Sequence, residues 1–174
     1  MSRPLTGPSP ELLTKGLKAC TLEDIRWARC DIKSTSLLAN IMLLQQAKEA
    51  GAEDAILVRN GLALEGTASS LFIVRNGALR TPPKGPFILP GITRDLVLEL
   101  AAAHGMAFEV EDITAAELAD ADEIWLTSST REIVPVTFLD STPVGQGKPG
   151  RAWNRMNAWY QDSKIRLRMG LSAC

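Results

Sequence analysis

The sequence predicts a mixed α/β domain, and three observations lead to this class. Strand-forming runs rich in Val, Ile, Leu and Phe follow one another between residues 55 and 75. Apolar residues recur at helical spacing within residues 37–51, 93–105 and 152–168. At 174 residues and 45% hydrophobic content, the chain is long enough to bury one sizeable core, so one domain is expected.

The first residues differ in character from the rest of the chain. The opening MSRPLTGPSPELL is rich in Pro and Ser and contains no apolar run long enough for a signal peptide or a membrane span. We interpret residues 1–18 as a linker remnant and residues 19–174 as the folded domain. Whether a further segment precedes this linker is a question that the sequence leaves open.

Charge and cysteine content restrict the possible partners. Nineteen basic and twenty acidic residues are scattered without runs, which disfavours nucleic acid and anionic membranes. The three cysteines, Cys20, Cys30 and Cys174, form no Cys-x-x-Cys pair, so neither a disulfide framework nor a metal site is indicated. A reduced, cytoplasmic setting fits this pattern best.

A strand followed directly by a helix is predicted around Lys33. Residues 24–32 alternate imperfectly, with Ile25, Trp27 and Ile32 as strand formers, which predicts a half-buried strand that ends at Lys33. The hydroxyls of residues 34–36 then offer N-caps for a helix that reaches Gly51. Its apolar stripe consists of Leu37, Leu38, Ile41, Leu43 and Leu44.

The next block predicts a meander of antiparallel strands. The runs at 55–59, 62–66 and 71–75 are separated by Asn60-Gly61 and followed by Asn76-Gly77, the dipeptide favoured in two-residue hairpin turns. Further elements are expected in this order: a short strand at 87–89, a helix at 93–105 that follows Pro90-Gly91, a strand at 108–113, a helix at 115–121, strands at 123–129 and 133–139, and a helix at 152–168.

Lys33 and Glu65 are the first candidates for chemistry. A lysine between an apolar strand and an apolar helix has its stem near the core, and a partly desolvated lysine has a lowered pKa and can act as a Schiff-base nucleophile. A solvated surface lysine is the alternative. Glu65 lies in a half-buried strand, where a carboxylate needs a cationic neighbour, although a strand-edge glutamate that faces water fits equally well.

Two other segments offer groups suited to an anion. Gly91-Ile92-Thr93 places free backbone N–H groups at a helix N-terminus, where a phosphate is favoured. The run from Thr127 to Thr130 supplies four adjacent hydroxyls at the end of an apolar strand. A helix start that binds nothing and a simple turn stabilised by Ser and Thr side chains are the alternatives.

Four motifs in order carry a resemblance to a known family. RCDIKS, LEGTASSLFIV, ILPGITR and LTSSTREIVPV resemble the motif series of the fold-type-IV pyridoxal-phosphate aminotransferases, with most similarity to the D-amino-acid branch. The resemblance runs from Cys20 to the last helix. It implies the C-terminal large domain of that fold, a β-barrel-like sheet with surrounding helices, and a homodimer. The small N-terminal domain typical of the family does not precede these motifs.

The resemblance also implies a role for each site residue. Lys33 would form a Schiff base with pyridoxal 5′-phosphate and move the proton between substrate and cofactor. Glu65 would face the pyridine nitrogen, while Ile92 and Thr93 would bind the phosphate. The remaining members would be Leu89 against the cofactor ring, Ser128, Ser129 and Thr130 on the phosphate and substrate side, and Arg26 as a supporting residue.

These roles imply a transaminase that exchanges an amino group between a D-amino acid such as alanine and a 2-oxo acid, with turnover impaired because the small domain is missing. TASS stands where the family often has TSSN, which puts cofactor hydrogen bonding or substrate preference in doubt. Two alternatives remain. One is a branched-chain aminotransferase or aminodeoxychorismate lyase of the same fold. The other is a folded, inactive module with an exposed apolar face.

Overall fold

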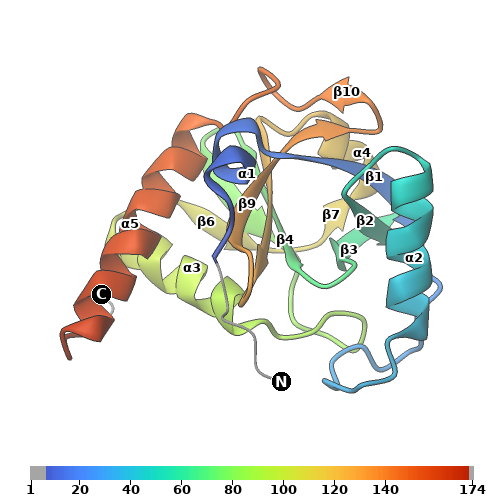
Figure 1. Cartoon of the computed structure of the whole chain (residues 1–174), viewed down its shortest axis with the longest axis horizontal. Helices are drawn as coiled ribbons and strands as arrows, with labels where there is room; N and C mark the ends of the chain where they lie inside the picture. The colour runs from blue at the N-terminus through green and yellow to red at the C-terminus, as the bar shows by residue number, and fades with distance from the viewer. Residues whose placement is uncertain (1–6, 173–174) are drawn as a thin grey trace.

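The strands of the chain form one mixed sheet that curls into a barrel (Figure 1). The computed structural model describes residues 7–172. Within that range the strands are β1 (Leu17–Glu23), β2 (Asp54–Arg59), β3 (Leu62–Gly66), β4 (Ser70–Arg75), β5 (Ala78–Thr81), β6 (Phe108–Val110), β7 (Ile113–Thr114), β8 (Glu123–Ser128), β9 (Glu132–Leu139) and β10 (Thr142–Pro143). The helices are α1 (Pro10–Lys15), α2 (Leu38–Glu49), α3 (Ile92–Ala103), α4 (Ala115–Ala119) and α5 (Arg151–Arg168).

The barrel closes through a single residue pair. Strands follow one another in the order β4-β8-β9-β1-β2-β3, and the antiparallel pair Glu65↔Ser70 joins β3 back to β4. β1 runs parallel to both β2 and β9, whereas the other neighbours in this ring are antiparallel. Glu65 therefore lies at the closure of the barrel.

Helices cover two opposite sides of the barrel (Figure 1). α3 and α5 pack on one side against Phe72 and Trp125, which are fully buried. α2 packs on the other side, where Leu43 and Ala47 contact Leu57 of β2. The barrel interior holds a separate cluster of small and branched side chains, among them Leu17, Ile56, Leu71, Ile73, Ile124, Leu126 and Val134.

The predicted meander is confirmed. β2, β3, β4 and β5 pair antiparallel in sequence order. Asn60 and Gly61 have φ of 51° and 79°, and Asn76 and Gly77 have φ of 52° and 79°, the left-handed geometry of a two-residue hairpin turn. The helices and strands expected from residue 93 onward also appear, except that the strand expected at 108–113 divides into β6 and β7.

The strand predicted at residues 24–32 is wrong. The strand in this part of the chain is β1, which ends at Glu23, and no regular element follows until α2. A strand on this core would bury the apolar residues and expose the polar ones, but the reverse is found here. Asp24 and Arg26 are buried, while Ile25 is 56% exposed and Trp27 is 52% exposed. Ion pairing in the interior thus outweighs burial of the apolar side chains here.

The cap and the apolar face expected for α2 also need correction. The helix begins at Leu38, and no side chain caps it; the Ser34 hydroxyl instead accepts a hydrogen bond from Ser36 N at 3.3 Å. Only part of the expected stripe reaches the core, since Leu43 is 1% exposed and Leu38 is 72% exposed. The exposed members of the stripe, among them Leu38 and Ile41, lie at the start of the helix.

Two further expectations differ from the structure. Residues 10–15 of the expected linker form α1, capped by Ser9, whose hydroxyl accepts from Leu12 N at 3.2 Å, and Leu17 already belongs to β1. Residues 1–6 of that linker lie outside the described residues. The strand expected at 87–89 is a turn closed by the bridge Gly85↔Ile88.

Because one leucine of α2 is buried and another is exposed, replacing each by alanine should change the free energy of unfolding by different amounts. Leu43→Ala removes a buried side chain from the contact with β2, so the free energy of unfolding should fall by about 2–5 kcal/mol. Leu38→Ala is the matched control and should change it by less than about 0.5 kcal/mol. Urea denaturation measures both. Equal losses would contradict the placement of α2.

Candidate active site

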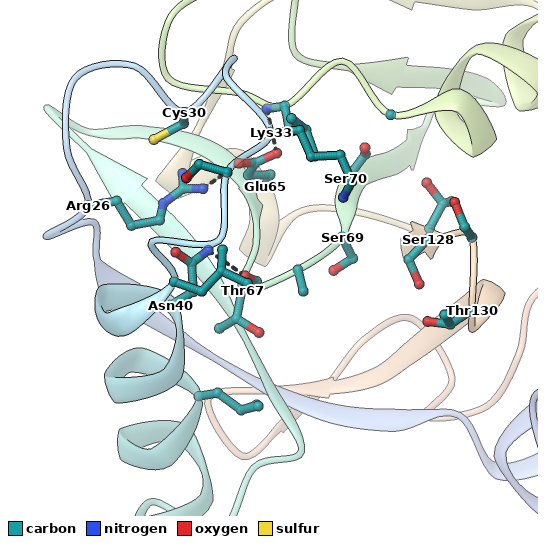
Figure 2. A pocket seen from close by; sticks show the side chains of 18 of the residues that line it. Arg26, Cys30, Lys33, Asn40, Glu65, Thr67, Ser69, Ser70, Ser128 and Thr130 are labelled. Carbon is teal, nitrogen blue, oxygen red and sulfur yellow. Dashed lines mark hydrogen bonds and ion pairs between the residues drawn. The ribbon is translucent and has the colours of Figure 1, made fainter. Parts of the chain in front are cut away.

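All nine residues singled out from the sequence line one pocket at the rim of the barrel (Figure 2). The cavity measures about 370 Å³. Its walls come from the loop at residues 24–37, the first turns of α2, the turn between β3 and β4, the start of α3, and the turn after β8. The nine residues are Arg26, Lys33, Glu65, Leu89, Ile92, Thr93, Ser128, Ser129 and Thr130.

Glu65 is the buried charge of the pocket. Glu65 precedes the last residue of β3, at the barrel closure, and is only 4% exposed. One carboxylate oxygen pairs with Arg26 Nη1, and the other accepts from Leu89 N at 3.0 Å. Burial raises the pKa of Glu65, while the charge of Arg26 and these hydrogen bonds act to lower it. The alternative of a water-facing glutamate is therefore wrong.

Arg26 has its guanidinium nitrogens committed within the protein. Nε and Nη2 donate to the two oxygens of Asp24 at 2.8 and 3.1 Å, and Nη2 also donates to Phe87 O at 3.1 Å. Nη1 contacts Glu65. Burial acts to lower the pKa of Arg26, but its bonds to Asp24 and the charge of Glu65 leave that pKa above its ordinary value. Arg26 thus orients Glu65 rather than presenting free donors.

Lys33 lies in the loop at residues 24–37 rather than at a strand end. Its side chain lines the pocket but is exposed, so the expected burial of its stem is wrong. Backbone contacts hold the loop: Cys30 N donates to Pro86 O at 2.7 Å, and Arg59 Nη2 donates to Arg26 O at 2.7 Å. Lys33 and Glu65 face the same cavity from different segments (Figure 2).

The opposite side of the pocket offers uncommitted donors. Ile92 and Thr93 open α3, and no side chain caps its first turn. Ser69 Oγ and Thr127 Oγ1 are buried, line the pocket and have no hydrogen-bond partner among residues 7–172. Buried hydroxyls are normally paired, and a helix N-terminus favours an anion. This side therefore fits a phosphate.

A second network holds the walls in place. Asn40 of α2 donates to Thr67 O at 2.7 Å, and the Thr67 hydroxyl donates to buried Asp54 at 2.6 Å. Arg131 pairs with the other oxygen of Asp54, and its backbone N–H donates to Ser128 Oγ at 3.2 Å. Three walls are thus connected through one buried carboxylate.

Apolar side chains surround the mouth of the pocket. Ile92, at the start of α3, is 75% exposed. The other exposed apolar residues that line this mouth are Trp27, Ile32, Leu37 and Ile41. Together with the polar interior, they form a site that is suited to a flat, charged ring compound.

Several members of the site were not identified from the sequence. Asn40 and Cys30 line the pocket, and Asp24 and Arg59 lie behind Arg26. An acidic residue two positions before Arg26 is a local indication of the first ion pair. Nothing in the sequence indicates that Arg59, at the end of β2, reaches this loop.

The pocket, with a lysine and a buried carboxylate on one side and anion donors on the other, agrees with the family comparison. The amino-transferase class IV family matches residues 3–139, more than half of the chain. The chain therefore belongs to the class IV aminotransferases. This result confirms the resemblance carried by the four motifs.

Particular relatives support the same assignment. The chain is 42% identical over 160 residues to a D-alanine aminotransferase from Bacillus licheniformis. The matched region covers 92% of this chain and 56% of that protein. The branched-chain aminotransferase from Thermoproteus uzoniensis, solved with norvaline, has a TM-score of 0.81 at 28% identity, covering 90% of this chain and 54% of that one. For the T.th. branched-chain aminotransferase with pyridoxamine 5′-phosphate, the TM-score is 0.80 at 28% identity, covering 89% and 52%.

Two conclusions follow from these relatives. The predicted fold class, a mixed α/β domain with a barrel-like sheet, is confirmed. The chain spans about half the length of the curated relatives it matches. Separately, no helix within residues 7–172 has the length and apolar character needed to cross a membrane.

The buried position of Arg26 predicts a large loss of stability when it is replaced. Arg26→Met leaves Asp24 and Glu65 without a shared cation, and the free energy of unfolding should fall by about 3–5 kcal/mol. Arg75→Met, which removes more exposed ion pairs to Glu117 and Asp120, should cost no more than about 1 kcal/mol. Denaturation of both variants tests this, and equal costs would contradict a buried pair.

Proposed function

We propose that this pocket binds pyridoxal 5′-phosphate and supports transamination between an amino acid and a 2-oxo acid. The observation that carries the proposal is the shared cavity of Lys33 and the buried, arginine-paired Glu65. The unpaired hydroxyls of Ser69 and Thr127 beside the start of α3 support a phosphate at the other side. When bound, the cofactor supplies an electron sink that stabilises negative charge at the substrate Cα.

The residues of the chain divide the remaining work. Lys33 would hold the cofactor through Nζ, and the free Nζ amine would serve as the base that takes the proton from the substrate Cα. Glu65, kept ionised by Arg26, holds a proton on the pyridine nitrogen. The N–H groups of Ile92 and Thr93 bind the phosphate, with Ser128, Ser129 and Thr130 on the same side. Leu89 packs against the ring.

D-Alanine is the substrate favoured here. The curated relative named above, which is 42% identical, is a D-alanine aminotransferase. The structural similarity to branched-chain aminotransferases supports the alternative of a branched-chain substrate. An aminodeoxychorismate lyase activity would use the same lysine and glutamate, but no feature of the pocket favours it.

The exposed apolar mouth supports a homodimer in which a second subunit covers the site. A cytoplasmic enzyme agrees with Cys20 and Cys30 as buried, free thiols. The inactive assembly module remains the competing proposal, and it predicts no chemistry at Lys33.

Covalent trapping tests the cofactor site. After incubation with pyridoxal phosphate and reduction with borohydride, peptide mapping should find the label on Lys33. Lys33→Arg should abolish that label, whereas Lys48→Arg, which changes an exposed lysine of α2, should leave it intact. Label spread over Lys15, Lys48 and Lys148 would favour the inactive module.

The substrate class is tested with the loaded chain. Adding D-alanine should release pyruvate in a single turnover, because its amino group remains on the cofactor. L-Leucine is the comparison, and its oxo acid should form at least about tenfold more slowly if the D-amino-acid assignment holds. Faster reaction with L-leucine would assign the site to branched-chain substrates, and Glu65→Gln should slow both reactions.

A further inference from the structure

Behind the pocket, two residues outside its lining form a second layer of charge. Asp24 receives Nε and Nη2 of Arg26 on one side and Arg59 Nη2 on the other, the last at 3.0 Å. The side chain of Asp24 is completely buried. Arg59, Asp24, Arg26 and Glu65, in this order, thus form a row of four charges with alternating sign.

Arg59 is fixed more tightly than a surface arginine. Its Nη2 donates to Arg26 O at 2.7 Å as well as pairing with Asp24, and its guanidinium lies 4.3 Å from the centre of the Phe87 ring. The side chain is only 17% exposed. Phe87 O in turn accepts from Arg26 Nη2 at 3.1 Å, so both arginines contact the same residue.

We infer that Arg59 is a positioning residue that acts through Asp24 and Arg26 on the ionisation of Glu65. Two carboxylates and two guanidinium groups balance each other in this row, which is the condition for keeping charges away from water. If Arg59 is removed, Arg26 is left as the cation of both carboxylates, so the net charge beside Glu65 becomes more negative and the charged form of Glu65 is disfavoured. The consequence for catalysis rests on the proposed function, because Glu65 acts there on the cofactor nitrogen.

The other charged and titratable groups near Glu65 do not replace this row. Burial raises the pKa of Glu65, Arg26 acts to lower it, and the charge of Asp24 acts to raise it. Lys33 and the Cys30 thiol share the cavity with Glu65, and the remaining contact of its carboxylate is the neutral Leu89 N–H. The row therefore makes opposite predictions for Arg59 and Asp24, its two members outside the pocket lining.

The experiment follows the carboxyl carbon of Glu65 by NMR against pH in the chain without cofactor. The resonance is assigned by its absence in Glu65→Gln. Arg59→Gln leaves a net negative row and should raise the titration midpoint by about one pH unit. Asp24→Asn leaves a net positive row and should lower it by a similar amount. Arg59→Lys keeps the positive charge, so the titration midpoint of Glu65 should stay within about 0.3 pH unit of its value in the unmodified chain.

Opposite shifts separate this role from a structural one. If Arg59 and Asp24 merely hold the loop, both variants admit water and the midpoint should move in the same direction. Shifts of the same sign, or no shift in Arg59→Gln, would overturn the inference. Arg75→Gln changes a matched arginine of β4 that pairs with Glu117 and Asp120, and it should leave the titration midpoint of Glu65 unchanged.

The outcome is independent of the proposed function because no cofactor is present. A failed label at Lys33 would count against cofactor binding and leave the row intact, whereas a failed shift would count against the row alone. If Arg59→Gln does not fold, the titration midpoints of Glu65 in Asp24→Asn and Arg59→Lys still test the inference. A raised midpoint in Asp24→Asn would overturn it.

Discussion

Glu65 can remain charged inside this fold because Arg26 lies against it. A buried carboxylate without a cation would take up a proton, and a neutral acid could not stabilise positive charge on a bound ring. The irregular course of residues 24–37 follows from this requirement, since a strand on the same core would bury Ile25 and Trp27 in place of Asp24 and Arg26. The same loop presents Lys33 to the cavity.

The barrel supplies the rigid frame for this ion pair. Glu65 closes the ring of strands opposite Ser70, so the carboxylate is fixed by the backbone pairing that completes the fold. α3 begins on the far side of the cavity, where its free N–H groups and the unpaired hydroxyls of Ser69 and Thr127 are suited to an anion. The carboxylate of Glu65, which suits a positive charge, and the donors at the start of α3, which suit an anion, thus face one pocket from different sides.

Much of this arrangement could be predicted from local patterns. Asn-Gly turns, helical spacing and ordered motifs identified the hairpins, the later helices and nine of the residues that line the pocket. The loop before α2 could not be predicted, because its alternation of apolar and polar residues matches a strand and only tertiary ion pairing reverses which set is buried. The role of Arg59 could not be predicted for a similar reason, because its hydrogen-bond partners lie more than thirty positions away along the chain.

The central claim is that one pocket holds pyridoxal phosphate between Glu65 and the start of α3. A crystal structure of the chain grown with pyridoxal phosphate tests it most directly. We predict density for the phosphate at Ile92 and Thr93, beside the hydroxyls of Ser69 and Thr127, and for the ring nitrogen against the carboxylate of Glu65. A phosphate elsewhere on the chain, or a ring nitrogen turned away from Glu65, would contradict this account.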